Sequence, residues 1–259
     1  MTAVQASRAT AVGELAPISL DELVERAALL TRVDRKYVVP THLLDDILTT
    51  LPTGTRVLEI DGRRRFGYRS TYLDTPDHQS YLVAGRGHRH RWKVRSRSYL
   101  DTGDCWLEVK TRTTRGQNLK QRIEHPDAET AGGLTAEGRA FVGDVIGTTA
   151  TRALHPVLVT AYQRTTLFLP RSASRVTIDV DLGWTALDSR RDLDRPTLAV
   201  VETKTGSTPS EMDRLLWRHG HRPVRISKYG VGMAALDPTL PRLKWHHTLH
   251  RHLDLPRTA

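Results

Sequence analysis

The sequence predicts an α+β protein in which helices flank an antiparallel β-sheet. Many short segments alternate β-branched or aromatic residues with polar ones and are bounded by Gly, Pro or Asp, which is typical of strands. A few longer segments carry helix-capping signals. With 38% hydrophobic and 26% charged residues, the 259-residue chain can bury a sizeable core. One large domain is therefore expected.

Four segments carry the signals of amphipathic helices. The predicted starts are Ser19, Thr41, Thr135 and Thr208. Ser19 is followed three residues later by Glu22, a capping-box pattern. The last helix is expected to use Thr208 as its N-cap and to run to about His219. In contrast, Gly85-Arg86-Gly87 lacks the Gly-Lys-Ser/Thr ending of a phosphate loop and is interpreted as a hairpin turn.

The composition along the chain predicts three parts. Residues 1–17 lack sustained periodicity and are expected to form a mobile leader, residues 18–236 the folded domain, and residues 237–259 a C-terminal tail. The tail is rich in Pro, His and Arg and has apolar residues only around Leu243, Trp245 and Leu249, so loose packing is expected. A His-rich tail of this kind needs no metal ligand.

Net charge and cysteine content restrict the possible partners and compartments. The formal charge of +10 favours an anionic partner: nucleic acid, a phosphate compound or anionic lipid. The single cysteine, Cys105, excludes an intrachain disulfide and a cysteine-based zinc cluster. No apolar run approaches the roughly 20 residues that span a membrane, and the first 17 residues lack the apolar core of a secretory signal. A cytoplasmic location is predicted.

Charged side chains recur at every second position of the predicted strands, so they share one face of each strand. The rows are Arg32, Asp34 and Lys36; Arg91, Lys93, Arg95 and Arg97; Glu108, Lys110 and Arg112; Lys120, Arg122 and Glu124; Arg164; Arg175, Asp179 and Asp181; and Glu202 and Lys204. Basic residues dominate these rows more than they dominate the whole chain, where 39 Lys and Arg face 29 Asp and Glu.

Two interpretations of these rows are open. For any one strand, a charged face simply exposed to solvent is the common case in antiparallel sheets. Rows of like charge on neighbouring strands are costly, however, unless an anion lies among them. Closing the sheet into a barrel would turn the charged face inward around such a ligand, with helices over the apolar outer face.

Several short motifs, in this order, make the chain resemble the catalytic domain of vacuolar transporter chaperone (VTC) polyphosphate polymerases, in the triphosphate tunnel metalloenzyme (CYTH-like) superfamily. The resemblance extends from about Thr31 to Met233. It rests on Arg32 to Tyr37, Tyr72-Leu73-Asp74, Lys93 to Arg97, Leu107 to Lys110, Lys120-Gln121-Arg122, Tyr162-Gln163-Arg164, Arg175 to Asp179, Val201 to Lys204 and Ser227-Lys228-Tyr229.

The resemblance implies an eight-stranded tunnel β-barrel whose basic side chains hold a phosphate chain. The implied catalytic residues are Lys36, Arg95, Arg97, Lys110, Arg164 and Lys228, and the implied substrate-binding residues are Lys120, Arg122, Arg175 and Lys204. Glu202 is the implied ligand of Mn²⁺ or Mg²⁺, with Glu108 as a weaker candidate or an orienting group. The implied partners are ATP and inorganic polyphosphate, with a separate membrane partner conceivable and no nucleic acid.

The implied activity is transfer of the ATP γ-phosphate to a growing polyphosphate chain. Tunnel hydrolases of the superfamily tend to begin with Glu-x-Glu-x-Lys, whereas Arg32 and Asp34 occupy the two glutamate positions here, which favours the polymerase. The alternatives are a tunnel-type triphosphate or polyphosphate hydrolase and a non-catalytic polyphosphate-binding module. A nucleic-acid binder ranks lower, because few aromatic residues alternate with the basic rows.

Overall fold

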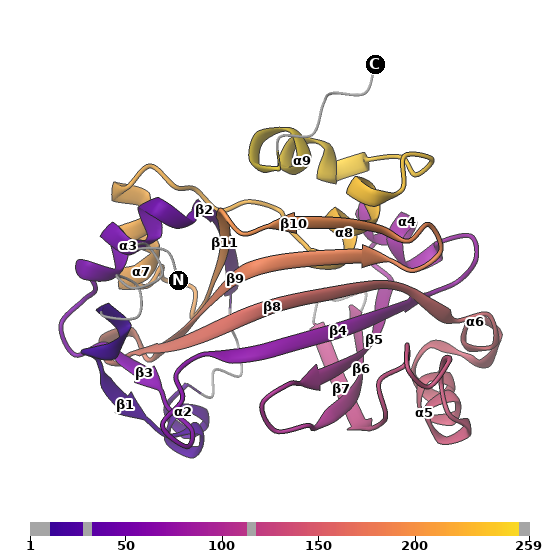
Figure 1. The fold of residues 1–259 in the computed structure, drawn as a ribbon, viewed down its shortest axis with the longest axis horizontal. Coiled ribbons are helices and arrows are strands. Elements are labelled where there is room, and N and C mark those ends of the chain that lie inside the picture. The colour runs from indigo at the N-terminus through magenta and orange to yellow at the C-terminus, as the bar shows by residue number, and fades with distance from the viewer. Residues whose placement is uncertain (1–10, 28–32, 113–117, 254–259) are drawn as a thin grey trace. The chain divides into compact units, whose positions relative to one another are not determined.

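A computed structural model describes residues 11–27, 33–112 and 118–253, which form two compact units (Figure 1). Unit 1 consists of residues 1–66, 162–182 and 195–224, and unit 2 of residues 67–161, 183–194 and 225–259. The long strands β8 (His155–Leu169) and β9 (Ser174–Ala186) run through both.

Unit 1 is a sheet with helices on its apolar face. Its elements are β1 (Ala16–Ile18), α2 (Leu20–Arg26), β2 (Val33–Pro40), α3 (Thr41–Thr49), β3 (Arg56–Leu58), the 3-10 turn η1 (Pro170–Ser172), β11 (Leu198–Thr205) and α7 (Glu211–Arg218). The strand order is β2-β11-β9-β8, with β3 pairing β8 and β1 pairing β3. The pairs β2–β11 and β11–β9 are antiparallel.

The core of unit 1 lies between this sheet and its helices. Tyr37 and Val201 from the sheet pack with Ile47 of α3 and Leu216 of α7, and all four are buried. Because side chains alternate along a strand, the neighbours of these core residues point to the opposite face, which carries the charged row. One buried carboxylate also belongs to the helix side: Asp213 accepts hydrogen bonds from the hydroxyls of Tyr37 and Thr203, each at 2.7 Å.

Unit 2 contains the rest of the sheet. Its elements are β4 (Phe66–Asp74), α4 (Gln79–Gly85), β5 (Arg91–Tyr99), β6 (Cys105–Arg112), β7 (Asn118–Glu124), α5 (Ala136–Ile146), α6 (Thr148–Arg152), β10 (Arg191–Arg195), α8 (Lys228–Leu236), the 3-10 turn η2 (Leu243–Trp245) and α9 (His246–His252). The strand order is β8-β4-β5-β6-β7, and the β4–β5, β5–β6 and β6–β7 pairs are antiparallel.

The apolar face of β5 and β6 is covered by α5 and by the segment that precedes it. Val94, Leu107 and Val109 from the strands pack with Val142 of α5. Gly138 is required at this contact, because a Cβ there would lie 2.6 Å from a ring nitrogen of His125. The helix therefore sits directly on the sheet.

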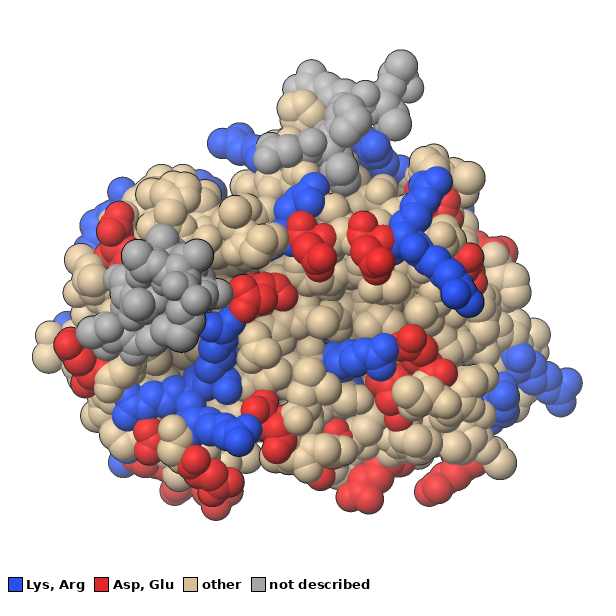
Figure 2. All heavy atoms as spheres, in the orientation of Figure 1, with Lys and Arg blue, Asp and Glu red and all other residues tan. Residues whose placement is uncertain are grey.

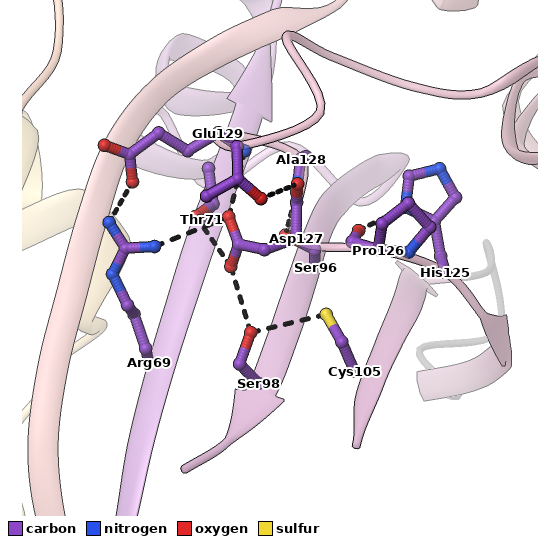
Figure 3. A network of polar contacts seen from close by, with 11 residues as sticks. Arg69, Thr71, Ser96, Ser98, Cys105, His125, Pro126, Asp127, Ala128 and Glu129 are labelled. Carbon is purple, nitrogen blue, oxygen red and sulfur yellow. Dashed lines mark hydrogen bonds and ion pairs between the residues drawn. The ribbon is translucent and has the colours of Figure 1, made fainter. Parts of the chain in front are cut away.

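A polar network connects residues 127–129, which precede α5, to β4 and β5 (Figure 3). Asp127 accepts hydrogen bonds from the hydroxyls of Thr71 at 3.0 Å and Ser98 at 3.0 Å, and its carboxylate lies 3.5 Å from Arg69. Arg69 also forms an ion pair with Glu129. These residues lie on the face opposite the basic row of β5, so the network stabilises the sheet without using that row.

The α+β class and the antiparallel sheet are confirmed, but the sheet is not closed into a barrel. The strand path begins at β2 and ends at β7, and no pairing joins these two strands in the described ranges. Within unit 1, the edge of β2 is partly occupied by other backbone, since the Val224 N–H donates to the Lys36 carbonyl at 2.7 Å. That contact uses a backbone group that a further strand would need.

The predicted helices are present, with one error and some omissions. Ser19 and Thr135 cap α2 and α5 as expected. The N-cap of α7 is Ser210 rather than Thr208, because Ser210 and Asp213 form a reciprocal capping box. Gly85 ends helix α4 and does not begin a hairpin turn. Helix α8 is also missing from the sequence prediction.

The two terminal segments are more ordered than expected. In the predicted leader, residues 1–10 lie outside the described part, whereas Arg64 donates to the carbonyls of Val12, Gly13 and Leu15. In the predicted tail, Trp245 and Leu249 are buried, so the expectation of loose packing was wrong. The division into leader, domain and tail itself stays a prediction.

Within the described residues, none of the helices is both long enough and apolar enough to cross a membrane.

Candidate phosphate-binding surfaces

Each unit brings together part of the predicted site. Unit 1 holds Lys36, Arg164, Arg175, Glu202 and Lys204, and unit 2 holds Arg95, Arg97, Lys110, Lys120, Arg122 and Lys228. Arg32 lies outside the described residues. On the face drawn in Figure 2, basic and acidic side chains lie beside one another in small groups, so the charge of +10 does not form a uniform basic coat there.

In unit 2, the register of three antiparallel strands places three lysines side by side. Lys93 of β5 lies opposite Lys110 of β6, which lies opposite Lys120 of β7. We call these three residues the lysine row. Like charges directly opposite one another destabilise a sheet. This row is therefore the strongest indication in the structure that the protein binds an anion.

The neighbouring row places a carboxylate, Glu108, between two arginines. The other carboxylate of this face in the described strands, Glu124, is exposed and lies opposite Trp106. Arg95 lies opposite Glu108, and Glu108 lies opposite Arg122. The Glu108 side chain is fully buried; it accepts from Arg95 Nη2 at 2.6 Å and contacts Lys120 Nζ at 2.5 Å. Glu108 therefore orients two cations, which matches the second of its two predicted roles.

The electrostatics of this surface follow from the excess of cations. Burial alone would raise the pKa of Glu108, but the charges of Arg95, Arg97 and Lys120 outweigh burial and hold that pKa well below its ordinary value. Repulsion from Arg95, together with burial and Arg97, lowers the pKa of Lys110 well below its ordinary value. Lys110 makes no hydrogen bond or ion pair with another described residue. Its ammonium group is thus available to an anion.

The aromatic residues on this face hold two arginines in place. Arg97 lies 5.5 Å from the centre of the Tyr68 ring and donates to Ser70 Oγ at 3.3 Å. Arg122 lies 4.4 Å from the centre of the Trp106 ring. A guanidinium held over an aromatic face has a fixed plane, so the directions of its N–H groups are fixed as well.

Two of the sequence motifs meet at the start of α8, and this contact was not predicted. The buried carboxylate of Asp74 accepts from the backbone N–H groups of Ser80 and Tyr81 and from the hydroxyl of Tyr229. Tyr229 also stacks on Tyr72, with ring centres 5.0 Å apart. The Tyr72-Leu73-Asp74 segment thus positions Tyr229 and, through it, the first turn of α8.

That first turn carries Lys228 beside the basic face of β5. Ser227 caps the helix by accepting from the Gly230 N–H, and it also accepts a 2.7 Å hydrogen bond from Lys93. The Lys228 carbonyl accepts from the indole N–H of Trp184 at 2.9 Å. The spacing Ser-Lys-Tyr therefore supplies a cap, a cation and an anchor in consecutive residues.

In unit 1, the predicted metal ligand Glu202 lies between two lysines. Its carboxylate contacts Lys36 Nζ at 2.5 Å and Lys204 Nζ at 3.8 Å. Burial alone would raise the pKa of Glu202, but Lys204, Lys36 and Arg164 outweigh burial and keep it well below its ordinary value. Burial, only partly offset by Glu202, lowers the pKa of Lys204 to about 8.

The acidic residues Asp179 and Asp181 of β9 form salt bridges with arginines. Asp179 receives two hydrogen bonds from Arg164, at 2.6 and 2.8 Å, and Asp181 pairs with Arg65. Arg175 lies directly opposite Lys204 in the register. Two carboxylates thus remain among the cations of this surface in the described part of unit 1: Glu202, and the exposed Asp34, which lies opposite Lys204.

One carboxylate is enough for the metals that were predicted. The described residues contain no group of three or more His, Cys, Asp or Glu side chains that could enclose a metal ion. Mg²⁺ and similar ions bound to phosphate substrates usually take only one or two protein carboxylates, the rest of the ligands being phosphate oxygens and water. An ionised Glu202 next to a phosphate-binding surface fits that mode.

Comparison with models of known protein families identifies the family of this chain. The model of the VTC domain matches residues 31–237. The chain belongs to the VTC domain family. The resemblance found from the motifs is thereby confirmed. Lys244 and the rest of the C-terminal segment of this VTC-domain protein lie beyond the matched residues.

Solved structures with a similar fold come from several organisms. A protein from Bacillus halodurans described as a candidate adenylate cyclase is 14% identical, with 76% of this chain and 94% of that chain covered and a TM-score of 0.49. A Hippeastrum protein, described as a candidate adenylyl cyclase with a dominant triphosphatase activity, is 16% identical, with 82% and 99% covered and a TM-score of 0.49. No curated protein matches the VTC-domain chain by sequence.

Proposed function

We propose that this VTC-domain protein is a polyphosphate polymerase. The terminal phosphate oxygen of a polyphosphate chain attacks the γ-phosphorus of ATP, the bond from that phosphorus to the β–γ bridging oxygen breaks, and ADP leaves while the chain grows by one phosphate. The observation that supports the proposal most is the lysine row, because like charges directly opposite one another destabilise a sheet and a bound polyanion would offset that repulsion.

Phosphoryl transfer suits a site that has many cations. The reaction depends on in-line positioning and on neutralising the charge of the transferred group. We assign this task in unit 2 to Arg95, Arg97, Lys110 and Lys228, and phosphate binding to Lys120 and Arg122. Arginine binds paired phosphate oxygens through its fork, whereas lysine supplies a mobile point charge.

In unit 1 we assign Lys36 and Arg164 to the transferred group and Arg175 and Lys204 to the phosphate chain. Glu202 would hold the divalent metal, which when bound neutralises charge on the phosphate oxygens as a Lewis acid. Lys36 now contacts Glu202 at 2.5 Å, so its ammonium group would move from the carboxylate to a phosphate when substrate binds. The low pKa of Glu202 keeps the carboxylate ionised for this exchange.

The difference at the first strand favours a polymerase over a hydrolase. A tunnel triphosphatase tends to place two glutamates where this chain has Arg32 and Asp34, and the described member of that pair, Asp34, is exposed at the start of β2. A substrate mixture of ATP, Mn²⁺ and a short polyphosphate primer tests the proposal against its alternatives. Longer polymer and ADP support the polymerase, release of inorganic phosphate alone indicates the hydrolase, and binding without turnover indicates a non-catalytic polyphosphate-binding module.

Phosphate binding in unit 1 is expected to weaken at alkaline pH. The pKa of Lys204 is about 8, so the side chain loses its charge as the pH rises through that value. An arginine stays protonated throughout this range. We therefore expect the affinity for tripolyphosphate, measured by calorimetry from pH 7 to pH 9.5, to fall less steeply in Lys204→Arg than in the wild type. Parallel curves for the two proteins would contradict this assignment.

A further inference from the structure

The basic face of β5 and β6 continues beyond the lysine row. Arg91 and Arg112 occupy the next alternate positions and lie directly opposite one another. Two residues along a strand correspond to about 6.6 Å, so this pair is one step further along the same face. Arg91 donates to the carbonyl of His88 at 3.0 Å, and neither arginine forms an ion pair with a carboxylate in the described part of the chain.

The C-terminal segment places a third cation, Lys244, near Arg91 and Arg112. Tyr81 of α4 donates to the Pro241 carbonyl at 2.8 Å, and Lys244 donates to the carbonyl of Ala84. Trp245 packs on α8 so closely that a Cβ at Gly230 would lie 2.4 Å from its ring. These contacts fix the position of Lys244, which is not on a loose tail.

Arg225, just before α8, is the fourth cation. Its carbonyl accepts from the Thr248 hydroxyl of α9 at 3.3 Å, and Ser227, two residues later, accepts from Lys93 of the lysine row. Burial, followed by the charges of Arg91, Arg225 and Arg112, lowers the pKa of Lys244 to about 8. The three arginines thus repel the ammonium group of Lys244, and Arg112 repels Arg91. None of the four has a carboxylate partner among the described residues.

We propose that Arg91, Arg112, Arg225 and Lys244, here called the terminal cluster, bind the part of a long polyphosphate chain that extends past the lysine row. A triphosphate on the lysine row leaves the next row uncovered, whereas a longer chain can cover both. Single-stranded nucleic acid fits the cluster less well, because its tryptophan, Trp245, is buried and offers no stacking surface. The inference rests on the proposed function and adds selectivity for chain length to it.

The test compares two ligands on the full-length chain. Dissociation constants for tripolyphosphate and for long-chain polyphosphate are measured by calorimetry on the wild type and on the double variant Arg91→Gln/Arg112→Gln. Arg225→Gln is a second variant that alters no residue of the sheet. Arg152→Gln is the matched control. Arg152 is an exposed arginine of α6 and belongs to neither β5 nor β6 nor the segment before α8. Circular dichroism melting confirms that each variant is folded.

The expected result is a loss that depends on ligand length. The double variant and Arg225→Gln each lose about tenfold or more in affinity for long-chain polyphosphate, the effect of removing charge-assisted hydrogen bonds. Their affinity for tripolyphosphate changes less than about twofold, a difference too small for a lost charge-assisted hydrogen bond. Equal losses for both ligands, or no loss for either, would overturn the terminal cluster. A wild type that binds neither ligand would instead overturn the proposed function itself.

Discussion

Replacing Glu202 by glutamine is expected to abolish the response of phosphoryl transfer to Mn²⁺. The substitution keeps the size of the side chain but removes the negative charge that contacts Lys36 and Lys204. Metal ions supply several kcal/mol of charge stabilisation in such reactions, so the metal-dependent rate should fall about a hundredfold or more. The measurement is the initial rate of ADP formation across a Mn²⁺ titration.

A matched control separates this effect from a general change in charge. Glu25 is exposed on α2 in the same unit, so Glu25→Gln changes the net charge equally and should leave the titration unaltered. A Glu202→Gln variant with the wild-type dependence on Mn²⁺ would remove Glu202 as the metal ligand. That result would not bear on the phosphate contacts proposed in unit 2, because Glu202 belongs to unit 1.

Replacing Glu108 by glutamine is expected to lower the free energy of unfolding and yet to spare anion binding. Glu108 is fully buried, and its loss leaves Arg95 without its ionic partner. Breaking a buried ion pair costs about 3–5 kcal/mol, and the lower end applies here because Lys120 is partly exposed and screened. Urea denaturation at neutral pH should therefore show a loss of about 3 kcal/mol.

Melting temperatures with and without tripolyphosphate, together with a control variant, distinguish the loss of the ion pair from a simple packing defect. Because a bound polyanion can replace the missing charge, tripolyphosphate should raise the melting temperature of Glu108→Gln more than that of the wild type. Glu124→Gln, an exposed change on the neighbouring strand, should behave like the wild type. A stability loss that tripolyphosphate does not reduce would contradict the electrostatic explanation.

The direction of the pH dependence follows from the low pKa of Glu108. In the folded state that pKa is below the value of about 4.3 for an unperturbed glutamate. The wild-type carboxylate therefore stabilises the fold above about pH 4.3, and this contribution is lost as the pH falls below that value. The stability difference between wild type and Glu108→Gln should accordingly shrink on acidification.

Strand periodicity predicted the charged faces well, because a two-residue repeat follows directly from the geometry of a strand. The strands that carry Arg95, Glu108 and Lys120 occur where alternation placed them. Periodicity does not determine register. The alignment of Lys93, Lys110 and Lys120 in one row became visible only when the three strands were paired.

Contacts between distant segments were the part that sequence patterns could not supply. Asp74 and Tyr229 are far apart in the chain, and neither carries a local signal that predicts their hydrogen bond. Helix α4 was missed because its cap is the carboxylate of Asp74, five residues before the helix begins, and not a residue at the N-cap position. Barrel closure was an inference from charge, and charge alone does not pair two edge strands.

Transfer of label from ATP tests the central claim most directly. The full-length protein is incubated with Mn²⁺, a short polyphosphate primer and ATP labelled in its γ-phosphate, and the products are separated by chain length. A polymerase places the label in polymers that lengthen with time, with one ADP formed for each phosphate added. Label that appears only as inorganic phosphate, with a primer that does not lengthen, would contradict the assignment.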